Sequence, residues 1–147
     1  MDLTWHLRRF AELTTVELYA IMALRQQVFV VEQKCAYLDA DDLDQVSTHL
    51  WAERGGAIAA YLRIVPAGAK FDELSIGRVI TAPAARGSGL GRELMKRGIA
   101  AAGAVPIRLG AQAHLERFYA DLGFVRASDV YDEDGIPHVE MVRPALA

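Results

Sequence analysis

The stretch GRVITAPAARGSGLGRELM, residues 77–95, decides how this chain is interpreted. Its β-branched start predicts a strand that ends before Pro83, and its last residues have the apolar spacing of a helix. Glycines 87, 89 and 91 remove three side chains from the turn between them. The backbone amides of Gly87–Arg92 can then converge at the positive end of the helix dipole. This arrangement favours a diphosphate site, flanked by the guanidinium groups of Arg86 and Arg92; the alternative is a tight turn without a ligand.

The residues of this turn and their spacing exclude three familiar motifs. A dinucleotide-binding loop needs G-x-G-x-x-G, but here the third glycine comes one residue early. A Walker loop needs G-K-[ST], which is missing from the stretch. A nucleophile elbow needs G-x-S-x-G around Ser88, but residue 86 is arginine. The turn therefore belongs to another class of phosphate loop, or to none.

Composition limits the classes of protein further. The chain has 147 residues with 16 basic and 19 acidic side chains, which is typical of one globular domain covering residues 1–147. Cys35 is the single cysteine, so neither an intrachain disulfide nor a cysteine-based zinc site is expected. The run AIAAYL at 57–62 is far shorter than the ~20 residues of a membrane span. We expect a cytoplasmic protein without metal, membrane or nucleic-acid partners.

Strand and helix patterns alternate along the rest of the chain. Alternating apolar residues at 3–7 predict a first strand, and the capping box TTVE at 14–17 opens a helix that continues to about Val30. Gly55-Gly56 predicts a hairpin between strands 49–54 and 57–65. Further elements are expected as strands at 74–81 and 107–111, helices at 90–103 and 115–122, and a closing hairpin of strands 125–131 and 138–142. The predicted fold class is mixed α+β around one sheet.

Two segments together resemble the GNAT acyltransferase superfamily. VITAPAARGSGLGRELM is similar to its acyl-CoA loop, [QR]-x-x-G-x-[GA], and QAHLERFYADLGF at 112–124 is similar to the following N-x-x-A-x-x-x-Y-x-x-x-G-F segment. Gln112 stands where asparagine is common, and Leu115 where alanine is common. The segments LRQQVFVVEQKCAYLDADDLDQVSTHL and YDEDGIPHVEM extend the resemblance to the small ElaA-like branch, from about Leu24 to Met141.

The resemblance implies a splayed mixed sheet that binds acetyl-CoA or another acyl-CoA between two central strands. It assigns the pantetheine arm to the backbone of Val79, Ile80 and Thr81, and places Gln112 near that arm or the acyl carbonyl. The implied diphosphate loop consists of Arg86, Gly87, Ser88, Gly89, Leu90, Gly91 and Arg92.

The implied activity is acyl transfer, with acetyl as the expected group and a small-molecule or peptide amine as the acceptor. The alternatives are a non-amine acceptor and a non-catalytic CoA-binding regulatory module. The resemblance makes Tyr119 the candidate general acid. Some members carry a base where this chain has Ile107, so Glu32, His49, another acid or a water chain must replace it. Dimers are frequent among relatives, so a homodimer is one expected assembly.

Three other features have ordinary interpretations. The acidic stretch DADDLD at 39–44 fails the calcium-loop spacing, and it is expected to be a solvated loop or an attractor for a cationic acceptor. The four histidines show no metal-ligand spacing, and His49 and His138 are expected to cap strands or face a cleft. Trp5 and Trp51 are expected in the core, and Cys35 as an ordinary thiol.

Overall fold

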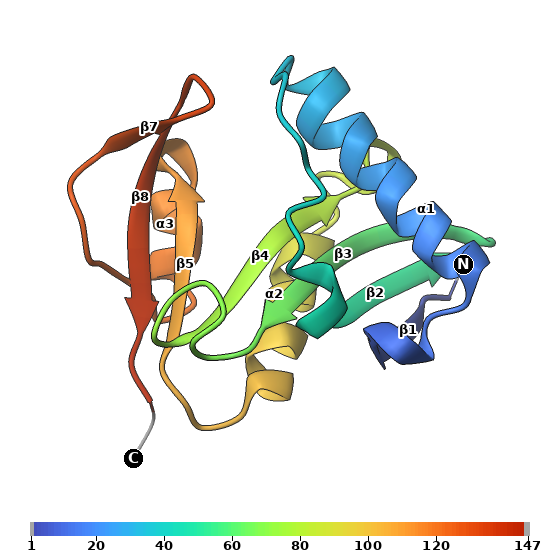
Figure 1. Ribbon diagram of the computed structural model, residues 1–147, viewed down its shortest axis with the longest axis horizontal. Coiled ribbons are helices and arrows are strands. Elements are labelled where there is room, and N and C mark those ends of the chain that lie inside the picture. Colours follow the sequence, from blue (N-terminus) through green and yellow to red (C-terminus); the bar gives the residue numbers. More distant parts are fainter. Residues whose placement is uncertain (1, 146–147) are drawn as a thin grey trace.

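A single twisted sheet organises the chain, with helices on both of its faces (Figure 1). The computed structural model describes residues 2–145. Along the sheet the strands follow the order β1-β2-β3-β4-β5-β8-β6, and β7 pairs with β8. Only the β4–β5 pair is parallel among the pairs described. The strands are β1 Thr4–Arg9, β2 Thr48–Arg54, β3 Ala57–Val65, β4 Leu74–Thr81, β5 Ile107–Gln112, β6 Val125–Arg126, β7 Tyr131–Glu133 and β8 Ile136–Arg143.

Three helices accompany the sheet: α1 (Thr15–Arg25), α2 (Leu90–Ala102) and α3 (Glu116–Ala120). The capping box predicted for α1 is present, because Thr14 Oγ1 accepts from the Glu17 amide while Glu17 accepts from the Thr14 amide. The helix does not continue unchanged to residue 30. Instead a π-helical segment, η2 (Gln26–Glu32), follows α1 directly.

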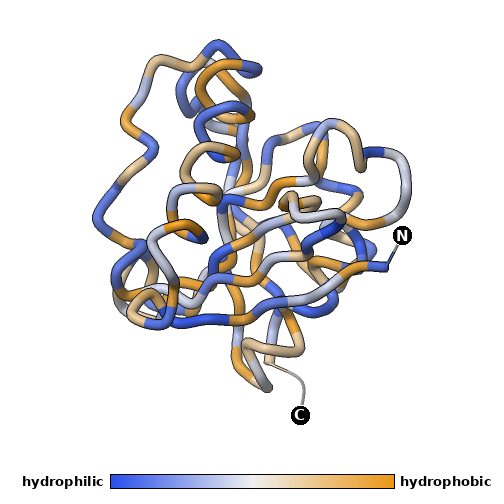
Figure 2. Tube along the Cα trace, turned by 90° about the vertical axis from the view of Figure 1, so that its right-hand side faces the viewer, coloured by the Kyte–Doolittle hydropathy of each residue, from blue (hydrophilic) through white to orange (hydrophobic). Residues whose placement is uncertain are grey.

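Two apolar cores lie on opposite faces of the sheet. Successive residues of β3 alternate between them: Leu62 and Ile64 pack with Leu94 of α2, whereas Tyr61 packs with Ile21 of α1. Both faces of β3 are thus covered, which explains its nearly unbroken apolar sequence. Hydropathy changes within a few residues along the chain (Figure 2), as expected of elements that turn alternate sides to a core.

The closing hairpin differs from its prediction. Residues 125–131 were expected to form one strand, but β6 and β7 are separated by residues 127–130. The Ala127 amide donates to the Glu140 carbonyl, and the Ser128 hydroxyl accepts from the Glu140 amide. A side chain thus replaces a backbone partner at this point of the ladder, and the strand is interrupted there.

Candidate active site

The sheet opens between β4 and β5. These strands pair at only two positions, Leu74 with Ile107 and Ser75 with Arg108, and then diverge (Figure 1). From residue 76 to Thr81, β4 keeps β3 on one side and has no described strand on the other. The fold thus presents an unpaired strand edge in the middle of the sheet, where an extended ligand can add backbone hydrogen bonds.

The backbone of Val79 and Thr81 faces this opening. The Ala82 amide donates to the Ala59 carbonyl, which fixes the direction of the antiparallel ladder. Because backbone groups alternate along a strand, Ile80 and Ala82 turn theirs toward β3. The Thr81 carbonyl follows this rule, since it accepts from Arg86 Nε at 3.2 Å on the side away from β3. Of the three expected pantetheine residues, Val79 and Thr81 therefore turn their backbone groups to the opening, where the Thr81 carbonyl already accepts from Arg86. Ile80 is instead buried and packs in the core on the α1 side of the sheet.

The turn after β4 collects unpartnered amides. Gly87 and Gly89 both have φ of +80°, a conformation that favours glycine, and Gly89 is the N-cap of α2. The amides of residues 87–92 donate to no other group in the described part of the chain. They lie at the positive end of the α2 dipole, so the turn has the donors that a diphosphate requires.

The two arginines that flank the turn differ. Arg92 is exposed, and none of the ion pairs among residues 2–145 includes it. Arg86 instead donates to both carboxylate oxygens of Glu32, at 2.6 and 3.0 Å. The hydrogen bond from Arg86 lowers the pKa of the Glu32 carboxyl. Glu32 thus lies beside the glycine turn at residues 87–92, and its role as a base stays a prediction.

Tyr119 lies in α3, next to the loop. A Cβ added to Gly91 would lie 3.1 Å from Thr81 Oγ1 and 4.0 Å from Phe118, so the end of β4 and the starts of α2 and α3 meet here. The Tyr119 ring packs edge-on against Phe118 and Phe124. Burial raises the pKa of Tyr119 to about 12, and no hydrogen bond contributes. The described polar atoms that are fully buried without a partner belong to His6, Arg54 and Arg63, so the Tyr119 hydroxyl reaches the surface of the core.

Gln112 ends β5 on the opposite side of the opening, half-buried and paired in register with His138 of β8. Gly110, two residues before Gln112 on β5, lies under the Tyr131 side chain. A Cβ added to Gly110 would lie 3.1 Å from the Tyr131 hydroxyl. The Tyr131 ring stacks on His138, whose ring nitrogen Nδ1 bonds the Ile136 carbonyl. Gln112 and Val79–Thr81 thus lie on the two strands that diverge, and a contact of Gln112 with a pantetheine arm stays a prediction.

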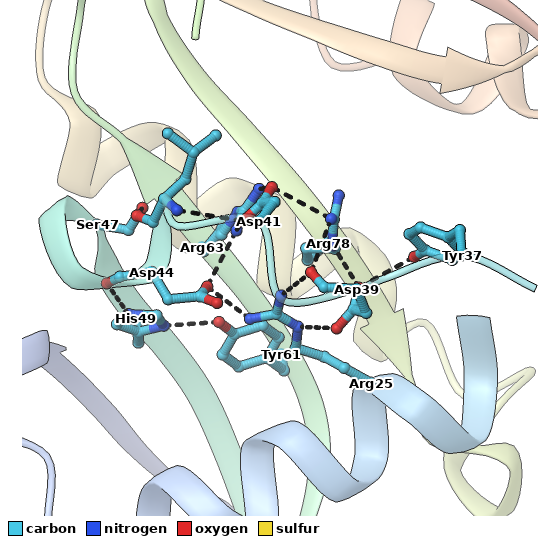
Figure 3. Close-up of polar contacts among 11 residues, drawn as sticks. Arg25, Tyr37, Asp39, Asp41, Asp44, Ser47, His49, Tyr61, Arg63 and Arg78 are labelled. Carbon is cyan, nitrogen blue, oxygen red and sulfur yellow. Dashed lines mark hydrogen bonds and ion pairs between the residues drawn. The ribbon is translucent and has the colours of Figure 1, made fainter. Parts of the chain in front are cut away.

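A buried network of three arginines and three aspartates lies beside β4 (Figure 3). Arg25 of α1 donates to Asp39 at 2.8 Å and to Asp44 at 2.6 Å. The remaining pairs are Arg63 with Asp41 and Asp44, and Arg78 with Asp39 and Asp41. Arg78 has φ of +52° at the point where the β3–β4 register shifts, so the network holds β4 where it bulges beside the opening.

This network corrects both expectations for Asp39 and Asp44, and Asp41 is half-buried and paired with Arg63, whereas Asp42 is exposed as expected. Asp39 is 4% exposed and Asp44 7% exposed, so these carboxylates are neither solvated nor free to attract a cationic acceptor. Burial opposes ionisation of Asp44, but hydrogen bonds from Arg25 and Arg63 outweigh it and lower the pKa. The sequence contains a signal for this network, because Arg63 interrupts the apolar strand AIAAYLRIV and Arg25 takes an inward position of a helix.

His49 extends the network and is fully buried, so it does not face a cleft. Its Nε2 lies 3.0 Å from the Asp44 carbonyl, which can only accept, so Nε2 carries the proton. Its Nδ1 then accepts from the Tyr61 hydroxyl at 2.6 Å. Burial lowers the pKa of His49, which keeps the ring neutral. His138, Cys35 and Trp51 are also buried.

The divided sheet with a glycine turn between its halves is the architecture of the GNAT acyltransferases. Residues 20–144 match the family described as acetyltransferase (GNAT) domain, and the chain belongs to that family. It is 39% identical to protein ElaA of Escherichia coli, with 97% of each chain covered, and 39% identical to UPF0039 protein sll0451 of Synechocystis, covering 97% of this chain and 96% of the relative.

Two crystal structures share the fold along nearly the whole chain. An acyl-CoA N-acyltransferase from Pseudomonas aeruginosa superimposes with a TM-score of 0.93 at 47% identity, covering 97% of this chain and 99% of that one. Escherichia coli ElaA superimposes with a TM-score of 0.92 at 38% identity and the same coverage. The predicted fold class and family are therefore confirmed.

No helix among residues 2–145 combines the length and apolar character that crossing a membrane requires.

Proposed function

We propose that this protein transfers an acyl group, acetyl in the first place, from acyl-CoA to an amine. The observation that carries the proposal is the run of free amides at residues 87–92, set at the end of an unpaired strand edge. One ligand satisfies both features, namely a diphosphate joined to an extended amide-bearing arm. The Pseudomonas aeruginosa relative, by its name an acyl-CoA N-acyltransferase, supports this proposal.

Each part of the site has a separate task in this proposal. The amides of residues 87–92, with Arg92, bind the diphosphate, and the backbone of Val79 and the amide of Thr81 pair with the pantetheine arm. Gln112 lies across the opening from them, in position to contact the same arm. The thioester supplies the activated acyl group, and the protein holds it at a fixed distance from the amine.

Tyr119 donates a hydrogen bond to the sulfur that leaves. Its hydroxyl has no partner in residues 2–145, and its raised pKa of about 12 keeps it protonated at neutral pH. A free thiol titrates near ~8.5, so complete proton transfer from this tyrosine costs about 5 kcal/mol. Tyr119 therefore keeps its proton and acts as a hydrogen-bond donor that stabilises the charge on sulfur in the transition state. The proton that the thiolate takes up comes from the amine nitrogen, which loses it on acylation.

The test is a pair of measurements on the purified protein. Calorimetry with CoA measures binding, and the release of free thiol from acetyl-CoA across a panel of amines measures turnover. Binding together with amine-dependent release supports the proposal. Binding without turnover on any acceptor would favour a regulatory CoA-binding module, and turnover with hydroxyl acceptors alone would favour a non-amine acceptor.

A further inference from the structure

The Glu32–Arg86 pair is the charged contact between the phosphate loop and the segment that follows α1. Glu32 ends the π-helical segment η2, and its carboxylate meets Arg86, 54 residues further along the chain. Both terminal nitrogens of the guanidinium donate to it, one to each oxygen. This two-pronged geometry is also the one in which arginine binds a phosphate group.

Arg86 is held in place by a second contact. Its Nε donates to the Thr81 carbonyl at 3.2 Å, at the end of β4. This bond anchors the guanidinium beside Gly87, the first of the residues with free amides, independently of Glu32. Removing the Glu32 charge therefore leaves Arg86 positioned and its outer edge available.

The Glu32–Arg86 ion pair can be replaced by a contact between Arg86 and a phosphate with little loss of free energy. The side chains of Arg86 and Glu32 are 45% and 43% exposed, and ion pairs at such positions contribute little net free energy. A diphosphate bound to the amides of residues 87–92 would bring two or more negative charges close to the Glu32 carboxylate. The anions would compete for the same guanidinium edge and repel each other.

We infer that Glu32 is an internal competitor of the substrate diphosphate: its carboxylate takes the edge of Arg86 that a phosphate group would use, and it thereby weakens acyl-CoA binding. This inference rests on the proposed function, since it requires the loop at 87–92 to bind a diphosphate. It assigns Glu32 to control of substrate affinity, a role distinct from that of a general base.

The experiment compares Glu32→Gln with the unmodified protein by calorimetry. The probes are CoA, inorganic pyrophosphate and pantetheine, which lacks phosphate. We expect Glu32→Gln to lower the Kd of CoA and of pyrophosphate by about two- to fivefold, the range that an exposed ion pair supports. The Kd of pantetheine should not change. In the Arg86→Gln variant, the gain in CoA affinity from Glu32→Gln should be smaller, because the guanidinium for which Glu32 and the phosphate compete is missing.

Glu73→Gln is the matched control. Glu73 also binds one arginine with both oxygens, accepting from Arg108 at 3.0 and 3.1 Å, but it lies before the start of β4, at the opposite end of the strand from the loop. This variant changes the net charge equally and should leave the Kd of CoA unchanged. An equal gain in affinity in Glu73→Gln would show a general charge effect and overturn the inference.

Three other outcomes would contradict the inference. An unchanged or raised Kd of CoA in Glu32→Gln would show that the pair merely positions the loop, and would overturn the competition. A lower kcat at saturating acetyl-CoA with the same Kd would return Glu32 to the role of base. If the unmodified protein bound neither CoA nor pyrophosphate, the proposed function itself would fail, and the inference with it.

Discussion

Two buried tyrosines of this protein have hydroxyls in opposite situations. Tyr61 donates to His49 inside the polar network, whereas no hydrogen bond contributes to the environment of the Tyr119 hydroxyl. The Tyr119 ring is buried, but its hydroxyl is not among the described polar atoms that are fully buried without a partner, so it remains accessible. Its position near the glycine turn at residues 87–92 is explained if it serves a ligand.

Tyr119→Phe tests this role directly. The change keeps the packed ring and removes only the hydroxyl, so the free energy of unfolding should stay within about 0.5 kcal/mol. We expect kcat to fall by ~10²-fold or more, with little change in the Kd of CoA. A variant that kept kcat within about twofold of the parent would remove Tyr119 from the mechanism.

Gly89 combines a backbone requirement with open space. Its φ is +80°, and a Cβ there would meet no atom within 4 Å. Gly89→Ala should therefore cost about 1–2 kcal/mol of stability through the left-handed conformation alone. We also expect a Kd for CoA raised about tenfold, because an added side chain and a shifted turn would hinder the close approach of the diphosphate to the neighbouring amides.

Gly56→Ala separates the two effects. Gly56 lies in the β2–β3 turn with φ of +81° and equally open surroundings, so the backbone cost should be similar. Thermal unfolding should show comparable losses for both variants, and calorimetry should show weaker CoA binding for Gly89→Ala alone. Equal CoA affinity in the two variants would count against the loop assignment.

At the scale of elements, the arginine–aspartate network joins α1, β3 and β4 through residues 39–44. Asp44 accepts from Arg25 and Arg63, and the side chains of both arginines are at most 1% exposed. Each arginine has a second aspartate, so the set is balanced in charge. Removing the Asp44 carboxylate would leave Arg25 and Arg63 with one partner each and the buried set with one uncompensated positive charge.

Asp44→Asn should therefore destabilise the fold by about 3–5 kcal/mol. For a chain of this length, this corresponds to a fall in Tm of roughly 10–15 °C. Asp42→Asn is the control, because Asp42 is exposed and takes no part in the network's ion pairs. Equal Tm values for the two variants in thermal unfolding would show that the network does not support the fold.

At the scale of the whole molecule, the network makes stability depend on pH in two steps. The pKa of His49 is lowered by burial, so the unfolded chain binds its proton first as the pH falls. The stability that the neutral His49 ring contributes is present above pH ~6.5 and is lost as the pH falls below that value. Arginine contacts outweigh burial and lower the pKa values of Asp41 and Asp44, so their contribution is lost as the pH falls below ~4.

We expect the free energy of unfolding to fall below pH 6.5 with a slope approaching about 1.4 kcal/mol per pH unit for one proton. His49→Gln should flatten the curve between pH 4 and 6.5, whatever its effect on the absolute stability. Denaturant unfolding at several pH values measures both slopes. The same slope in His49→Gln and the parent would contradict the assignment to His49.

The sequence by itself determined the elements whose signals are local. The Thr14–Glu17 capping box, the Gly55-Gly56 turn and the step from β4 through the glycine turn to α2 all appear where residue types predict them. Each of these signals depends on residues within a few positions, so neighbouring side chains and backbone dihedrals suffice to specify it. The interrupted strand at 125–131 is the exception, because its break depends on Glu140 of another strand.

The tertiary structure alone decided which charges meet. Arg86 and Glu32 are 54 residues apart, and Arg78 and Asp39 are 39 apart. No periodicity or spacing specifies such pairs, since they form only when the sheet and α1 bring distant segments together. Asp39, Asp41 and Asp44, which resemble part of a solvated acidic loop, thus pair with arginines beside β4, and Glu32, the acid suggested as a base, pairs with Arg86 next to the glycine turn. Burial and partner, which a linear pattern does not contain, set the chemistry of each charged group.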